Sequence, residues 1–123
     1  VIAVVGILSA AVLTALGPAR NKAKDSRIIS AINQVRAVAE TLYDGDYGGL
    51  PGGVVPLTGD ANFSRLAEDI KGNQGELTIN LAGDSLSYSA YSNLASDSGK
   101  FYCVDSAGNT EELDTAPGNE VCR

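Results

Sequence analysis

The chain has 123 residues, a length that fits one ordinary domain or one domain with a protruding element. It contains no histidine, which excludes serine–histidine and cysteine–histidine catalysis. Residues 1–36 carry five basic side chains and one acid, whereas residues 37–123 carry four basic side chains and fourteen acids. Because phosphate repels acidic side chains, this charge argues against nucleic acid as the main partner of residues 37–123.

The first 16 residues contain no charged side chain, and only the hydroxyls of Ser9 and Thr14 interrupt their apolar character. A cleaved signal peptide would carry a basic segment ahead of the apolar run, and a buried core helix would show a polar face. Neither pattern is present, so the run predicts a helix that sits in a membrane or in the core of an oligomer. Because 16 residues rise only ~24 Å, short of a ~30 Å hydrocarbon layer, we expect the natural start to lie upstream.

Residues 19–43 predict an amphipathic helix, because apolar side chains recur there at helical spacing. The stripe consists of Ile28, Ile32, Val35, Ala39 and Leu42, and it is widened by Ile29 and Val38. The basic cluster at residues 20–27 is placed to meet anionic lipid headgroups or acidic surfaces of neighbours. Gly17 and Pro18 predict a break between the two helical stretches, since proline lacks a backbone donor and clashes with the preceding turn. Without a break, both stretches would form one rod of ~60 Å.

The remaining sequence predicts a small head. Residues 44–75 are mostly loop, and within them Asp60 is expected to cap a short helix. The apolar face of that helix would hold Phe63, Leu66, Ala67 and Ile70. Residues 76–113 predict antiparallel strands, because apolar and polar residues alternate between turn signals. The predicted fold class is therefore α+β, with a protruding apolar helix (1–18) and a head (19–123) in which the amphipathic helix packs on an antiparallel sheet.

Two cysteines, Cys103 and Cys122, are spaced too widely for a zinc or redox motif. In an exported chain they predict one disulfide, which would close a glycine-rich loop and stabilise the fold by ~3 kcal/mol. The alternative is a pair of free buried thiols in a cytosolic protein. Residues 105–112 bring oxygen ligands together as a calcium site does, but they depart from the EF-hand pattern and are more typical of a polar turn. No metal, cofactor or catalytic residue is assigned.

Three segments of the chain carry a resemblance to a known family. Residues 1–13 read VIAVVGILSAAVL, residues 19–27 read ARNKAKDSR, and residues 32–43 read INQVRAVAETLY. Together they resemble the N-terminal helix of type IV pilins and the related pseudopilins, and residues 44–51 resemble the exit from that helix. The cysteine-closed C-terminal loop is similar to the D-region of pilins. The resemblance covers residues 1–51, and the rest of the head matches only in layout.

The resemblance implies a lollipop-shaped subunit whose rods bundle in the core of a filament while the heads cover the outside. The core residues would be Val1, Ile2, Val5, Gly6, Ile7, Leu8, Val12, Leu13 and Leu16. Gly6 matches the family glycine at which filament helices unwind, and Pro18 lies about one turn beyond the family's usual proline. A helix break is therefore expected at Gly6, Gly17 or Pro18. The family's methylated phenylalanine and nearby glutamate are not in this sequence, and we expect truncation to account for their absence.

The function expected from these residues is structural rather than enzymatic: a subunit of a type IV pilus that serves adhesion, surface motility or DNA uptake. Its partners would be copies of itself, the inner membrane before assembly and an ATPase-driven assembly machinery, with no small-molecule substrate. Two alternatives remain. One is a pseudopilin of a secretion system, and the other is a monomeric binding module whose helix is a plain membrane anchor.

Overall fold

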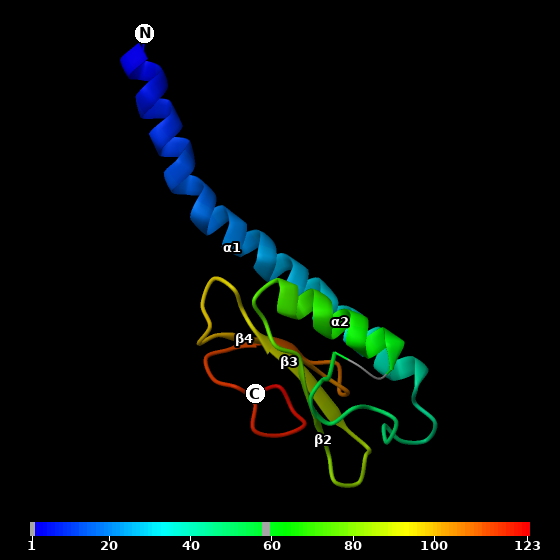
Figure 1. The fold of residues 1–123 in the computed structure, drawn as a ribbon. Coiled ribbons are helices and arrows are strands. Elements are labelled where there is room, and N and C mark those ends of the chain that lie inside the picture. Colours follow the sequence, from blue (N-terminus) through cyan, green and yellow to red (C-terminus); the bar gives the residue numbers. More distant parts are fainter. Residues whose placement is uncertain (1, 58–59) are drawn as a thin grey trace.

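The computed structural model describes residues 2–57 and 60–123, so Val1, Thr58 and Gly59 lie outside the described residues. Within the described ranges the chain forms α1 (Ile2–Thr41), β1 (Gly53–Val54), α2 (Ala61–Gly72), β2 (Thr78–Leu81), β3 (Tyr88–Asn93), β4 (Phe101–Asp105) and β5 (Thr110–Leu113). The second half of α1 lies against both α2 and the sheet, and the first half of α1 projects beyond this head (Figure 1). The predicted α+β class is confirmed.

Helix α1 is continuous over 40 residues and passes through Gly6, Gly17 and Pro18 without interruption. The predicted helix break is therefore wrong for the isolated subunit. A proline inside a helix removes one backbone hydrogen bond and clashes with the preceding turn, which kinks the helix axis. The helix continues beyond the kink when the turns on both sides are intact. Figure 1 shows such a change of direction in the blue part of the ribbon, between the projecting half and the head.

The core forms where the apolar stripe of α1 meets α2 and the sheet. Ile28, Ile32, Val35 and Ala39 of α1 are fully buried, as their spacing predicts. Their neighbours in the same cluster include Phe63, Leu66, Ala67 and Ile70 of α2, and Ile79, Tyr88, Ala90 and Val104 of the sheet. Each large apolar side chain buried in this way contributes ~1.5–3 kcal/mol. The stripe ends at Ala39, because the helix ends at Thr41 and the Leu42 side chain remains 39% exposed.

Helix α2 begins where the sequence places its cap. The Asp60 carboxylate accepts hydrogen bonds from the backbone N–H groups of Asn62 (3.0 Å) and Phe63 (3.2 Å), which have no partner within the helix. The same stretch, residues 44–75, also contains strand β1, which the prediction of a loop missed. Its first residue, Gly53, has a φ of +83°, a conformation that glycine adopts readily and other residues rarely do.

The five strands form an antiparallel meander in the order β1-β2-β3-β4-β5. Strand β3 does not show the expected alternation, because Ser89 and Ser92 are buried along with Tyr88 and Ala90. The C-terminal segment accounts for Ser89, whose hydroxyl donates to the Asn119 carbonyl (2.8 Å). Asn80 of β2 donates to the carbonyls of Pro117 and Asn119, both at 3.0 Å. Polar contacts from beyond β5 therefore cover part of the sheet's second face.

Asp105, at the end of β4, organises the turn that follows and the C-terminal segment. Its carboxylate accepts hydrogen bonds from the backbone N–H groups of Ala107 (3.1 Å), Asn109 (2.9 Å) and Cys122 (3.1 Å), and from the Asn109 side chain (3.0 Å). Burial disfavours the charged form of Asp105, but these hydrogen bonds outweigh burial and lower its pKa below the ordinary value. Residues 106–109 therefore form a turn between β4 and β5, and Thr110, Glu111 and Glu112 belong to β5.

The lowered pKa of Asp105 predicts a loss of stability in acid. A carboxylate whose pKa is depressed by folding stabilises the native state above its unfolded pKa of 3.8, and this contribution disappears as the pH falls through the folded pKa. We expect Asp105→Asn to lower the free energy of unfolding near neutral pH. The difference in this free energy between variant and wild type should become smaller below pH ~4. Chemical unfolding at a series of pH values measures this. An equal gap at pH 7 and pH ~2.5 would contradict the assignment.

Candidate interaction site: the apolar arm of helix α1

Residues 2–16, which we name the apolar arm, are exposed along their whole length. Ile2 is 90% exposed, and Ile7 and Leu13 are 70% exposed, values far from those of core residues. The large exposed side chains of the arm are Ile2, Val4, Val5, Ile7, Leu8, Val12, Leu13 and Leu16. All the residues predicted to pack in a filament core lie in this arm, except Val1, which is outside the described residues. A contiguous apolar surface of this kind marks a site of contact with a membrane or another protein.

Large side chains surround most of the helix axis, and small residues occupy the rest. At 100° per residue, Ala3, Gly6, Ala10 and Gly17 fall on one face of the helix. A Cβ atom added at Gly6 or Gly17 would meet nothing within 4 Å, so the fold of this subunit does not itself require glycine there. A two-stranded coiled coil would need only a narrow apolar seam. Apolar residues all round the axis suit a bilayer or a bundle in which each helix has several neighbours.

The two hydroxyls of the arm are compatible with an apolar environment. Ser9 donates to the Val5 carbonyl (2.9 Å), and Thr14 donates to the Ala10 carbonyl (2.5 Å), so both hydroxyl protons are satisfied within the helix. An 18-residue window of α1 is apolar enough to cross a membrane by length and composition, and none of it is buried against the rest of the chain. A signal sequence passes the same test, whereas a core helix of this kind would be buried.

One buried carboxylate joins the projecting half of α1 to the head. Asp25 is only 6% exposed, and its Oδ1 accepts hydrogen bonds from the backbone N–H groups of Ala95 (2.7 Å) and Ser96 (3.0 Å). The Ser96 hydroxyl donates to the second oxygen, Oδ2. The loop between β3 and β4 is thereby fixed to α1 one turn before Ile28, the first fully buried apolar residue of the stripe.

Replacing Asp25 with alanine is expected to lower the free energy of unfolding by about 2 kcal/mol, because it removes a buried charged acceptor and the hydrogen bonds that the partly buried N–H groups of Ala95 and Ser96 donate to it. Asp25→Asn keeps an oxygen that can accept from Ala95 and Ser96, so its effect should be smaller. Thermal unfolding of the full chain in mild detergent, followed by near-ultraviolet circular dichroism, measures the difference. Asn33→Ala, an exposed polar substitution on the same helix, serves as the control. Equal stability of Asp25→Ala and the control would contradict this role.

Basic side chains follow the arm and lie along one flank of the helix. Arg20, Lys24 and Arg27 are spaced four and three residues apart, which places them on the same side of α1, and we name them the basic stripe. Arg20 and Arg27 are exposed, and Lys24 is partly exposed. Among the described residues, 2–57 and 60–123, the one ion pair is Lys100–Asp114. The cations of the stripe are therefore not neutralised by a carboxylate in the described part of their own chain.

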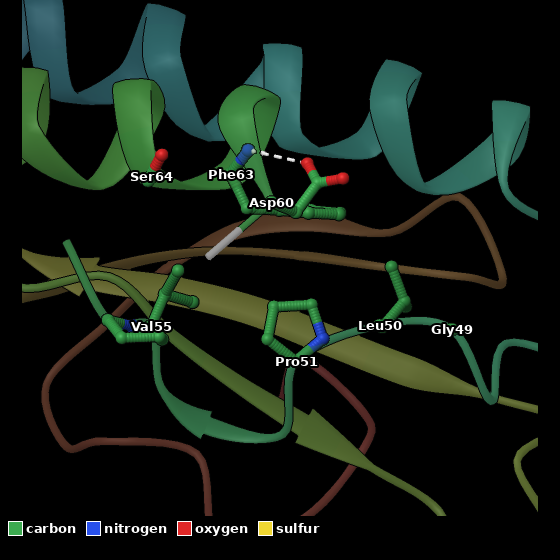
Figure 2. A pocket seen from close by; sticks show the side chains of 8 residues that line it. Gly49, Leu50, Pro51, Val55, Asp60, Phe63 and Ser64 are labelled. Carbon is green, nitrogen blue, oxygen red and sulfur yellow. Dashed lines mark hydrogen bonds between the residues drawn. The ribbon is translucent and has the colours of Figure 1, made fainter. Parts of the chain in front are cut away.

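The head also contains a small pocket between the loop before α2 and the start of that helix (Figure 2). Its volume is about 250 Å³, and its lining includes Leu50, Pro51, Val55 and Phe63. Among the described residues that line it, Asp60 carries the one ionisable side chain, and its carboxylate accepts hydrogen bonds from the N–H groups of Asn62 and Phe63 at the start of α2. The pocket walls therefore offer apolar contact and no free acid or base for proton transfer.

Sequence reasoning missed Asp25, although the sequence contains a signal for it. Asp25 lies three residues before Ile28, so it continues the buried stripe by one turn, and it is the sole acid in a basic cluster. Within the described ranges, no group of three or more Cys, Asp or Glu side chains is arranged to hold a metal ion. Comparison of the chain with protein-family models, curated proteins and solved structures found no match.

Proposed function

We propose that the chain is a structural subunit of a type IV pilus-like filament, which assembles by packing of its apolar arms and serves adhesion, surface motility or DNA uptake. The observation that carries this proposal is the apolar arm, in which eight large apolar side chains are exposed on a helix continuous with the head. Such a surface is not stable in water and requires lipid or protein around it. The head would face the outside of the filament.

The composition of the arm suits an exchange between lipid and sister helices. Lipid tails are as apolar as leucine, so helices in a membrane associate through close packing rather than through the hydrophobic effect. The small face formed by Ala3, Gly6, Ala10 and Gly17 lets a neighbouring backbone approach closely. The subunit would wait in the inner membrane, and the transfer of its arm into a filament core would be nearly balanced in free energy.

The second candidate function is a monomeric binding module anchored by the arm. It is favoured by two observations: an 18-residue window of α1 is apolar enough to cross a membrane by length and composition, and the head has an apolar pocket. In that case one copy would be sufficient, and lipid alone would cover the arm. A pseudopilin of a secretion system is a variant of the filament proposal, since it uses the same packing of arms in a shorter assembly.

Electron microscopy of the purified full chain after detergent removal tests the proposal. A filament subunit should form thin fibres of uniform diameter with a regular helical repeat. The anchor is supported instead if the chain remains a monodisperse monomer in detergent and enters vesicles as single copies when the detergent is removed. Irregular aggregates without a repeat would also contradict the filament, because the arm would then be covered without specific packing.

A further inference from the structure

We propose that the basic stripe of one copy binds the acidic end of the head of a second copy, which stands parallel to the first and is shifted along the axis of α1. The acidic end consists of Asp44, Asp46 and Asp84, whose positions are described in the next paragraph. This inference rests on the proposed assembly into filaments, because it names the surfaces that set the spacing between copies in that assembly.

The acidic end lies at the part of the head remote from the arm. The loop after α1 contacts the turn between β2 and β3 through a hydrogen bond from the Tyr47 N–H to the Ser85 carbonyl (2.7 Å). This contact brings Asp44 and Asp46 to the same end of the head as Asp84, and Figure 1 shows both segments away from the N-terminus. All three aspartates are exposed. Residues 37–64 and 72–99 contain no lysine or arginine, so the segments that build this end carry only negative charge.

Positive and negative charges are therefore separated along α1. Lys24 and Asp44 are 20 positions apart, and at 1.5 Å per residue this corresponds to ~30 Å along the helix axis. Copies whose arms share one core point the same way. If two such copies stood level, the basic stripes would face each other and repel. A shift of ~30 Å instead brings the stripe of one copy to the level of the acidic end of the next.

The direction of the stripe favours a protein partner over lipid headgroups. Arg20 and Arg27 are seven residues apart, so the stripe extends ~10 Å along the helix axis. When the arm spans a membrane, a flat layer of headgroups meets mainly the first cation of such a stripe. A second copy standing parallel to α1 meets all three. Complementary exposed charges of this kind fix the register and orientation of a contact more than its affinity.

A double-mutant cycle in the full chain tests the pairing. The stripe variant carries Arg20→Gln, Lys24→Gln and Arg27→Gln, and the end variant carries Asp44→Asn, Asp46→Asn and Asp84→Asn. Asparagine keeps the side-chain oxygen with which Asp46 and Asp84 accept the N–H groups of Gly48 and Leu86. The matched control, Glu68→Gln with Asp69→Asn and Glu76→Gln, neutralises three exposed acids elsewhere on the head. The readout is the concentration of chain above which filaments sediment after detergent removal.

If the basic stripe binds the acidic end, each variant should raise this concentration about tenfold, a size expected for three exposed ion pairs. The variant that combines both sets of substitutions should raise it no further than either set alone. The control should match wild type. If the fold increases in this concentration multiply in the combined variant, the proposed pairing is wrong. So would a stripe variant that loses binding to vesicles containing anionic phosphatidylglycerol while its filaments form normally. A wild-type chain that forms no filaments would instead overturn the proposed function, so the two failures are distinguishable.

Discussion

Aspartate in place of Leu8 is expected to abolish assembly into filaments while leaving the head folded. Leu8 lies in the middle of the apolar arm, and its side chain is 61% exposed in the isolated subunit. A charged residue at the centre of an apolar helix environment costs ~2.5–3.5 kcal/mol, which lowers the assembly equilibrium constant by roughly 70-fold to 400-fold. Aspartate is chosen over lysine because its short side chain cannot extend to a polar boundary.

The matched control for this substitution is Gln34→Asp, at an exposed position of α1 within the head. Both changes introduce the same residue into the same helix, so effects of helix propensity and added charge are held constant. Electron microscopy counts filaments, and circular dichroism in detergent reports whether the head is folded. Leu8→Asp filaments as abundant as those of the control would show that the arm is not enclosed by apolar neighbours.

Replacing Cys103 and Cys122 with serine is expected to produce the largest loss of head stability. The disulfide between them joins residues 19 positions apart, and closing a loop of this size stabilises the native state by about 3 kcal/mol in the chain-entropy model. The melting temperature of the double variant should fall by about 15 °C. Both sulfurs belong to buried residues, so the variant also introduces two buried hydroxyls, which act in the same direction.

Wild-type protein unfolded in the presence of a reductant is the internal control, since it breaks the same bond without changing the sequence. A melting temperature within a few degrees of wild type for the double variant would identify a different anchor for the C-terminal segment. The candidates are its polar contacts, in which Asn80 and Ser89 bond the carbonyls of Pro117 and Asn119, and Asp105 accepts the Cys122 N–H. Substituting Ser89 with alanine in the double variant would then cause further loss.

The parts of the fold that follow regular periodicity were predictable from sequence. The stripe from Ile28 to Ala39 is buried as its spacing predicts, because helix geometry alone decides which residues share a face. The cap at Asp60 was predictable too, because its carboxylate accepts a hydrogen bond from a residue only two positions later in the chain, Asn62. Strand β1 could not be predicted, because a two-residue strand beginning with glycine is set by its pairing with β2 rather than by its own side chains.

In the arm and its junction with the head, some features were likewise predictable from sequence and others were not. Exposure of the arm follows from a run without a polar face, which no core of this size would bury on all sides. The sequence did not predict that α1 continues through Pro18. Proline costs the helix one backbone hydrogen bond, and whether the intact turns on both sides offset this cost depends on the whole helix. The role of Asp25 depends on a loop 70 residues later in the chain, and only the folded structure shows which backbone groups reach it.

The position of Asp25 also determines how the protein responds to mechanical load. A pull on the projecting half of α1 reaches the head first at this carboxylate, one turn ahead of Ile28 and the apolar core. The hydrogen bonds from Ala95 and Ser96 would be strained together, and the load would then spread in shear along the buried stripe. Tension along the helix axis is thus shared among many contacts arranged in parallel, and this geometry resists rupture better than one in which they open one after another.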